Sequence, residues 1–351
     1  MLLVQDTTEL DYSTHKALRG SGPVSDKSRR GFFLHNRLLV AGEEALVLGV
    51  GPAQTWARSD AEHGKAEHRK SLPIEEKESM RWLDGYAEAC MLAAELPGRK
   101  IIMIADRECD IYELYVRWRE HPQADFIVRA GRDRALLEEG HLFETLHAAP
   151  LLGGFDLEVK RKEQMVKIKE NRRRRVRESR MAGMEVRAMP VHPRPPQRKG
   201  LKLPGVELCA VLVREKDPPA GQEPIEWLFL TTLPVNDFEQ AMRIVRAYTR
   251  RWIVEEFHRV PKSGCRIEAL ALRESGALLA AVALYMVVAW RILYLRDLSR
   301  RHAGLPGTWF FTQAEIQAAR KTDPPPGAEC LWRGLEKLRC YVEMGQTLGA
   351  L

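Results

Sequence analysis

The chain has 351 residues, 45% hydrophobic and 29% charged, which suits a globular protein of one large or two modest domains. Its longest apolar run, Ala277–Trp290, has fourteen residues. A bilayer span needs roughly 18–20, so we expect a buried helix and no membrane partner. The amino terminus lacks a secretion signal, and none of the six cysteines pair at zinc-finger or CxxC spacing, so we expect a cytoplasmic protein with reduced thiols.

The formal net charge of +7 is concentrated in one segment. Between Lys160 and Lys202 there are sixteen Lys and Arg against four Glu, a local balance of +12 that leaves −5 for the rest. A run such as Arg172–Arg175 suits phosphate contacts and predicts salt-sensitive, sequence-independent affinity for DNA. A solvated basic loop without a dedicated partner is the alternative.

The first part of the chain alternates strands with helices. Asp6 and Asp106 each directly follow an apolar strand, where side chains emerge at the edge of a sheet and ligand sites form. Each aspartate could instead cap the next turn or helix. The predicted elements are strands Leu2–Gln5, Gly31–Val40 and Ala45–Val50, a helix from about Glu75 to Leu96, strand Lys100–Ala105, a helix over about 109–120 and strand Asp125–Arg129.

Residues 130–235 interrupt this alternation. They contain short alternating stretches, the basic Pro-rich segment and the strand-like LCAVLVRE and IEWLFLTT, so we expect an inserted all-β subdomain. Helices follow, one beginning near Asn236-Asp237 and one over about Ala277–Leu298, then a Pro-rich break at Pro324–Pro326 and a short helix Leu331–Glu343. The expected domains are therefore 1–129, 130–235, 236–300 and 301–351.

The helix after Asp237 carries four polar residues at regular spacing, namely Tyr248, Arg251, Glu255 and Lys262. At about 100° per residue they share one arc of roughly 60°. A carboxylate flanked by a guanidinium, an ammonium and a phenol can hold a divalent cation against a phosphodiester. A solvated charged helix face is the alternative. Pro261 removes a backbone donor and costs about 3 kcal/mol inside a helix, so the position of Lys262 on this face is the least secure.

The same four residues form Tyr-x2-Arg-x3-Glu-x6-Lys, the signature of the bacterial DDE transposases of the insertion sequence four family, which includes the transposon five transposase. The resemblance runs from about residue 2 to 300, through QDTT (5–8), EKES (76–79), IADRECDIY (104–112) and EPIEWLFLTTLPV (223–235). It implies an α/β, ribonuclease H-like catalytic core interrupted by the β-rich insertion, with a helical carboxy-terminal region.

The resemblance also implies the chemistry. It makes Asp6, Asp106 and Glu255 a catalytic triad that holds two Mg²⁺ ions, with Mn²⁺ as a substitute, for cleavage and strand transfer at transposon ends. Magnesium accepts hard oxygen ligands of this kind, and two ions can activate the water and stabilise the leaving oxygen. A homodimer bound to transposon ends and target DNA, associated with the bacterial nucleoid, is the implied assembly.

Further DNA contacts follow from the resemblance alone. They are Tyr248, Arg251 and Lys262 of the signature, together with Trp227, Arg129, Arg259 and His258. Trp227 matches the family position that stacks on a flipped base, although a Trp in EWLFLTT also reads as a core residue. His258 could equally be a surface helix histidine.

The sequence departs from the family at both ends. Met1 stands five residues before Asp6, where the family carries a DNA-end-binding domain, and only ECLWRGLEKLRCYV (329–342) matches the carboxy-terminal dimerisation region. A shortened remnant that inhibits the full enzyme through mixed dimers is therefore the alternative function. A generic ribonuclease H-like nuclease is a third possibility.

Overall fold

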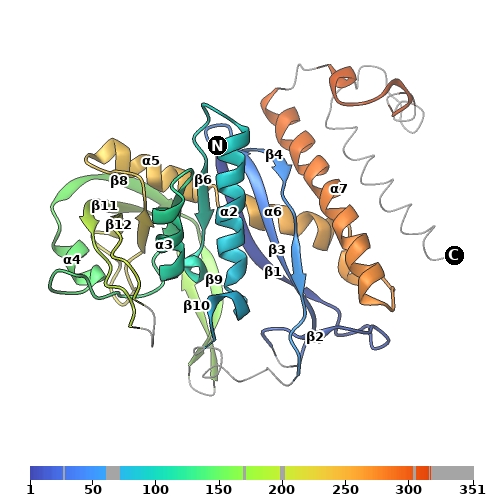
Figure 1. Cartoon of the computed structure of the whole chain (residues 1–351), viewed down its shortest axis with the longest axis horizontal. Coiled ribbons are helices and arrows are strands. Elements are labelled where there is room, and N and C mark those ends of the chain that lie inside the picture. Colours follow the sequence, from blue (N-terminus) through green and yellow to red (C-terminus); the bar gives the residue numbers. More distant parts are fainter. Residues whose placement is uncertain are drawn as a thin grey trace. The chain divides into compact units, whose positions relative to one another are not determined.

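The computed structural model describes residues 1–26, 28–60, 72–168, 171–197, 202–302, 306–315 and 317. The chain divides into two compact units, and Figure 1 shows the elements of each. Unit 1 comprises Met1–Met103 and Arg250–Leu351, and unit 2 comprises Ile104–Thr249. The expected mixed α/β class is confirmed.

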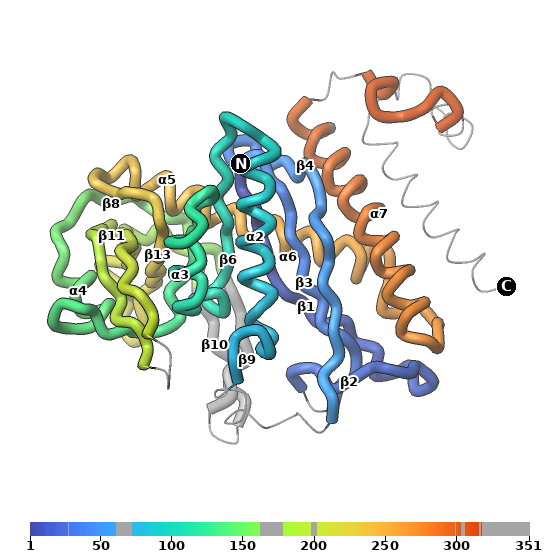
Figure 2. The backbone as a smooth tube through the Cα atoms, viewed as in Figure 1, coloured from blue at the N-terminus to red at the C-terminus, as the bar shows by residue number. Residues whose placement is uncertain are grey.

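The sheet of unit 1 is built on two long antiparallel strands, β1 (Leu2–Asp11) and β3 (Arg30–Ala41). They pair along their whole length, from Leu2 opposite Val40 to Asp11 opposite Gly31, and Figure 2 shows them side by side. The strand expected to end at Gln5 thus continues through Asp6, because Thr7 and Thr8 favour strands and β3 supplies backbone partners. Short strands β2 (Gly22–Pro23), β4 (Leu46–Val50) and β5 (Gln54–Trp56) also pair with β3.

Alternation along β1 and β3 separates two helical layers of unit 1. On one face, α2 (Met80–Glu95) packs with Trp82 edge-on to His35 at 4.7 Å between ring centroids. A Cβ atom on Gly85 would lie 2.0 Å from the Gln5 side chain, so only glycine allows this approach. On the other face, α6 (Trp252–Arg259) meets Asp6 and its cross-strand neighbour. Helix α2 starts later than expected, after the 3₁₀ turn η1 (Ile74–Glu76).

The signature segment is not one continuous helix. It begins as α5 (Phe238–Thr249) in unit 2, where Asp237 caps the first turn by accepting from the Gln240 backbone N–H at 2.7 Å. A turn at Arg250-Arg251 separates it from α6 in unit 1, and α6 runs into a π-helical turn, η3 (Val260–Gly264). Pro261 has no N–H, and the Cys265 N–H donates to the Val260 carbonyl five residues back, at 2.8 Å. The expected uniform arc of four residues is therefore wrong.

The last long helix, α7 (Ser275–Arg301), follows a 3₁₀ turn, η4 (Ile267–Ala269), and precedes another, η5 (Gly307–Trp309). Its stretch Ser275–Leu298 is long and apolar enough to cross a membrane by length and composition alone, and 33% of its most apolar window is buried. Leu284 and Val287 are 72% and 53% exposed. The helix that was expected to be buried is therefore only partly buried, and Trp290 anchors it by donating to the Val47 carbonyl at 3.1 Å.

Unit 2 contains an antiparallel sheet in the order β7-β13-β12-β11-β8. The expected insertion therefore continues the sheet begun by β7, and it includes one helix that was not predicted. Whether it is a separate subdomain stays a prediction. The elements are η2 (Arg107–Cys109), α3 (Tyr112–Glu120), β7 (Asp125–Arg129), α4 (Leu142–Ala148), β8 (Leu151–Val159), β11 (Arg180–Val191), β12 (Leu208–Glu215) and β13 (Glu226–Thr231), and β6 (Ile102–Ala105) spans the division between the units.

Two more strands of unit 2, β9 (Lys162–Ile168) and β10 (Asn171–Arg177), form a separate antiparallel pair. The basic segment Lys160–Lys202 is therefore not one loop. Its first half is this hairpin, and its second half includes β11, whose Ala182, Met184 and Val186 are buried in the main sheet. The predicted Pro324–Pro326 break, the helix Leu331–Glu343 and most of the region 301–351 lie outside the described residues.

Candidate active site

Two of the three predicted catalytic carboxylates are joined by one arginine. Arg251, at the amino-terminal end of α6, donates from Nη1 to Oδ2 of Asp6 at 2.6 Å and from Nη2 to Oε1 of Glu255 at 2.7 Å. The Arg251 and Asp6 side chains are 14% and 16% exposed, and that of Glu255 is 37% exposed. The guanidinium fork therefore balances two partly buried negative charges on β1 and α6.

The donor chemistry of this pair fits a hard divalent cation. Asp6 and Glu255 offer carboxylate oxygens, and the 14% exposure of the bridging arginine shows that the space between them is partly screened from water. Within the described ranges, no group of three or more His, Cys, Asp or Glu is arranged to hold a metal ion. Unit 1 thus supplies two candidate ligands with a built-in positive charge between them.

Asn36 is a polar neighbour that the sequence analysis missed. It lies directly opposite Asp6 in the β1–β3 register and is fully buried. Its Oδ1 atom accepts from Nε2 of His258 on α6 at 3.1 Å. The sequence signal was the polar triplet His-Asn-Arg (35–37) inside the otherwise apolar strand GFFLHNRLLV.

His258 lies in the interior of unit 1, which corrects both expectations for it. The side chain is 7% exposed, and burial, followed by the charge of Lys262, lowers its pKa to about 3. A buried neutral imidazole bonded to Asn36 offers a phosphate no charge. We therefore remove His258 from the proposed DNA contacts.

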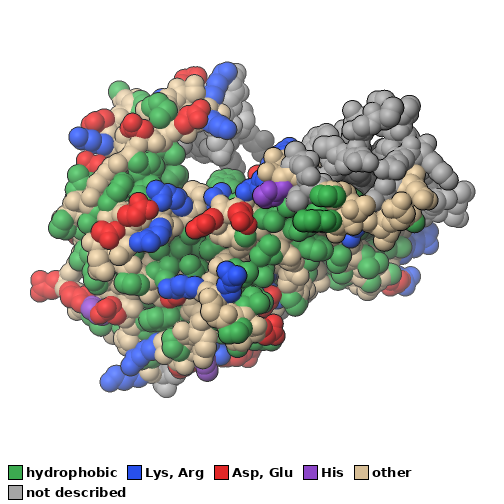
Figure 3. Space-filling model, turned by 90° about the horizontal axis from the view of Figure 1, so that it is seen from above, with side chains coloured by type: hydrophobic (Ala, Val, Ile, Leu, Met, Phe, Trp, Pro, Cys, Tyr) green, Lys and Arg blue, Asp and Glu red, His purple; other side chains and the backbone are tan. Residues whose placement is uncertain are grey.

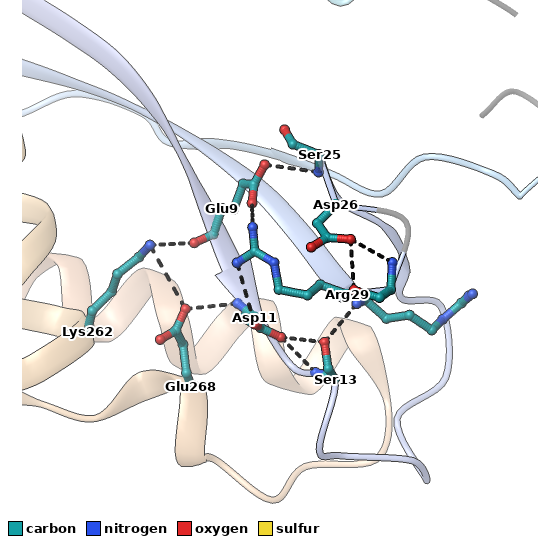
Figure 4. Close-up of polar contacts among 10 residues, drawn as sticks. Glu9, Asp11, Ser13, Ser25, Asp26, Arg29, Lys262 and Glu268 are labelled. Atoms are coloured by element: carbon teal, nitrogen blue, oxygen red, sulfur yellow. Dashed lines mark hydrogen bonds and ion pairs between the residues drawn. The ribbon is translucent and has the colours of Figure 1, made fainter. Parts of the chain in front are cut away.

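Lys262 is displaced from the Arg251 and Glu255 face by the π-helical turn. Its ammonium group donates to the backbone carbonyl of Glu9 on β1 and lies 3.9 Å from Oε1 of Glu268 (Figure 4). Figure 4 also shows Arg29 bridging Glu9 and Asp11, at 2.8 and 3.5 Å. Burial lowers the pKa of Lys262. In this conformation its contacts are internal, and its expected contact with DNA remains a proposal.

Asp106, the third predicted carboxylate, belongs to unit 2. It follows β6 and accepts from the Glu108 backbone N–H at 2.9 Å, so the capping alternative is the contact seen. The next turn is fixed by Asp110, which is buried and accepts from the backbone N–H of Gly131 at 2.7 Å.

Arg134 closes the Asp110 network by donating to its Oδ1 from Nε at 2.9 Å and from Nη2 at 2.6 Å. Tyr115 also donates to Oδ1, and burial raises the pKa of this phenol well above its usual value. Asp110 lies within IADRECDIY, but its partners Gly131 and Arg134 are 21 and 24 residues away, so no local sequence pattern predicted these bonds. These bonds tie the turn that follows Asp106 to Gly131 and Arg134.

The remaining predicted DNA contacts lie on different elements. In unit 2, Trp227 is half-buried on β13, and Arg129 on β7 donates to the Glu226 carbonyl at 3.2 Å. Tyr248 on α5 packs on Phe229, with 4.5 Å between ring centroids. In unit 1, Arg259 is exposed on α6. Trp227 is therefore not a fully buried core residue.

The charge is unevenly distributed along the sequence but mixed on the surface that is drawn. On the face seen in Figure 3, Lys and Arg side chains alternate with Asp and Glu, and no broad field of one sign forms among the described residues. In sequence, 160–179 contains ten Lys and Arg and three Glu, a balance of +7 that equals the net charge of the whole chain. The basic excess therefore belongs to the β9–β10 hairpin and its flanks.

Comparison with known proteins gives a family match. Residues 84–290, more than half of the chain, match the transposase DDE domain, a range that includes Asp106 and Glu255 but begins after Asp6. A solved piggyBac transposase synaptic complex with hairpin DNA is similar at 10% identity and a TM-score of 0.41. The alignment covers 97% of this chain, which spans about half (52%) of that protein.

Proposed function

The chain belongs to the family of transposases with a DDE domain, and from that premise we propose that it is the catalytic core of a bacterial insertion-sequence enzyme. In this proposal it resembles the insertion sequence four type, has a ribonuclease H-like core and cleaves DNA at transposon ends before strand transfer. The observation that carries the proposal is the Arg251 fork, which holds Asp6 and Glu255 together across β1 and α6.

The proposed ligands of the divalent ions, Mg²⁺ or Mn²⁺, are Asp6, Glu255 and Asp106. When bound, such ions supply an activated water and a charge that stabilises the leaving oxygen. Arg251 bonds to both carboxylates of unit 1. If an ion bound between these carboxylates, the two N–H donors of Arg251 would be available to a phosphate oxygen. In this proposal the Asp110 network positions the turn that follows Asp106.

The proposed DNA contacts fall into two kinds. Arg259 is exposed and, with Arg129, Arg251 and Lys262, would neutralise phosphates, while Tyr248 would donate a hydrogen bond. Lys262 must first leave the Glu9 carbonyl. Trp227, half-buried near the start of β13, would stack on an unpaired base for roughly 1–3 kcal/mol. A homodimer on paired ends, in the bacterial cytoplasm, is the proposed assembly.

The test is metal-dependent nicking of supercoiled or pre-cleaved DNA. Glu255→Ala should abolish nicking in Mg²⁺ and in Mn²⁺, because it removes a proposed ligand. Glu256→Ala is the matched control, since Glu256 is exposed and pairs instead with Arg296 on α7 at 2.9 Å, and it should retain activity. Nicking that survives Glu255→Ala would refute the assignment, and a wild-type chain that never nicks would favour the non-catalytic remnant.

A further inference from the structure

Two amide–imidazole pairs lie back to back on the central strands of unit 1. On the α2 face, Oε1 of Gln5 and Nε2 of His35 are 3.0 Å apart. On the α6 face, Oδ1 of Asn36 and Nε2 of His258 are 3.1 Å apart. All four side chains are buried. Each pair therefore joins a buried amide on the sheet to a buried imidazole. The two pairs differ in their surroundings, because one faces α2 and the other faces α6.

The His258 ring fixes the orientation of the Asn36 amide. Burial keeps the imidazole neutral, and an amide oxygen can only accept, so the proton must be on Nε2 of His258. The Nδ2 group of Asn36 then turns away from His258. This NH₂ group is buried and has no hydrogen-bond partner among the described residues.

The Asn36 side chain lies next to Asp6, a residue of the proposed metal site. Asn36 is the cross-strand partner of Asp6, and both side chains meet α6, through His258 and Arg251 respectively. Directly opposed residues of an antiparallel pair hold their Cβ atoms about 4.5–5.5 Å apart. A donor left unpaired at this position can be satisfied by an oxygen beside Asp6.

We propose that Asn36 is a positioning residue of the cleavage site, whose Nδ2–H donates to an oxygen acceptor held beside Asp6, with His258 fixing the amide. The acceptor is a water bound at the carboxylate or a phosphate oxygen of DNA. This inference rests on the proposed function, because it assumes that Asp6 binds the ion.

Gln5 provides the internal control. Its Nε2 group is also buried without a partner among the described residues, so an unpaired amide alone does not define a site. Gln5 faces α2, where Gly85 approaches it, and lies on the opposite side of β1 from Asp6. Replacing Asn36 removes a buried amide on the face with the proposed site. Replacing Gln5 removes a buried amide on the opposite face, and so serves as the matched control.

The experiment compares Asn36→Leu with Gln5→Leu in the full chain. Mn²⁺ affinity is measured by calorimetry without DNA, and affinity for a short duplex is measured in EDTA. Both variants should lower the melting temperature similarly. Only Asn36→Leu should weaken Mn²⁺ binding, by about 10-fold or more, if the acceptor is a water. If the acceptor is a phosphate oxygen, the loss appears in duplex affinity instead.

Three outcomes decide the matter. Wild-type Mn²⁺ and duplex affinities for a folded Asn36→Leu chain overturn the role of Asn36, while Asp6→Asn still loses Mn²⁺ binding. An Asp6→Asn chain with unchanged Mn²⁺ affinity overturns the proposed metal site and this inference with it. If Asn36→Leu fails to fold, Asn36→Thr replaces it, since threonine favours strands, adds no charge and lacks the amide donor. The same loss of Mn²⁺ or duplex affinity is then expected, and unchanged affinities overturn the proposal.

Discussion

At the scale of single residues, the site depends on one arginine with two carboxylates. Arg251 is 14% exposed and bonds to both Asp6 and Glu255. The signature spacing led to the prediction of Arg251 and Glu255 on one helix face, because four residues make about one turn. Their partner on β1 is 245 residues away from Arg251, and no local pattern encodes that distance.

We expect Arg251→Gln to destabilise the metal-free chain by about 1–3 kcal/mol, because two partly buried carboxylates then lose their charged donor. The stability of Arg251→Lys should lie between those of wild type and Arg251→Gln, since an ammonium group lacks the two parallel donors that reach both carboxylates. Urea unfolding in EDTA measures the change, with exposed Arg259→Gln on the same helix as control. Added Mn²⁺ should raise the melting temperature of Arg251→Gln more than that of wild type. Equal stability in EDTA would contradict the bridging role.

Two buried histidines predict a dependence of stability on acid. Burial lowers the pKa of His35 to about 2 and that of His258 to about 3, against about 6.5 in the unfolded chain. Between these values only the unfolded chain binds the protons, so stability is retained above pH 6.5 and is lost as pH falls. The loss approaches about 1.4 kcal/mol per pH unit for each histidine.

His258→Gln tests this acid dependence, because glutamine keeps a donor for Asn36 and does not titrate. Urea unfolding from pH 7.5 to 4.5 should show a slope lower by about 1.4 kcal/mol per pH unit than wild type below pH 6. The carboxylates contribute equally to both proteins and cancel in the difference. Parallel curves for variant and wild type would show that His258 is protonated in the folded state.

At the scale of elements, the sequence predicted the strands and helices of both units better than it predicted their ends. Apolar runs such as KIIMIA and alternating stretches identified the strands. The predicted end of β1 at Gln5 was wrong, because the polar residues from Asp6 onward also pair with β3. The π-helical turn at Pro261 could not be predicted, since the sequence shows the missing donor but not which carbonyl Cys265 then bonds.

The β9–β10 hairpin can be removed without cutting the main sheet. Val159 of β8 lies opposite Arg180 of β11, so an Asn-Gly turn can replace 160–179 and join the two strands directly. Deleting the whole range Lys160–Lys202 would instead remove β11, the partner of both β8 and β12, and expose the largely buried β12. The splice removes +7 of charge.

We expect the spliced chain to bind DNA with a flatter salt dependence. Each lost phosphate contact lowers the slope of log affinity against log salt by about 0.9, so four lost arginine contacts change it by roughly three to four. Filter binding or anisotropy from 50 to 200 mM salt measures the slope, and a four-fold Arg172–Arg175→Gln variant is the charge-only control. An unchanged slope in both would place the electrostatic contact elsewhere.

At the scale of the whole molecule, the sequence indicated the family and the mixed α/β class. The family match confirms a transposase with a DDE domain, and the helices and strands of the structure confirm the mixed α/β class. The predicted domain boundaries stay a prediction. The insertion was predicted from the alternating stretches of 130–235, and its strand β13 shares a sheet with β7, where Thr231 pairs with Ile127. Strand pairing over about 100 residues of sequence joins segments whose local patterns carry no mark of each other.

The proposed ligand set includes Asp106 as well as Asp6 and Glu255, so metal binding should test each of the three carboxylates. We expect wild type to bind two Mn²⁺ per chain in calorimetry. In Asp106→Asn, one of the two ions should bind about 10-fold more weakly or be lost, although Asp6 and Glu255 are intact. Asp156→Asn, an exposed change in the same unit, is the control and should bind like wild type. Unchanged stoichiometry and affinity for Asp106→Asn would exclude it as a ligand.

The guanidinium between Asp6 and Glu255 has a consequence for how the protein is made. Acidic clusters in many metal enzymes repel one another until the ion arrives, and the polypeptide matures only where that ion is plentiful. Here the chain carries its own counterion between Asp6 and Glu255, so it can reach its final shape during synthesis without an ion and bind the proposed divalent cation afterwards, as a separate event.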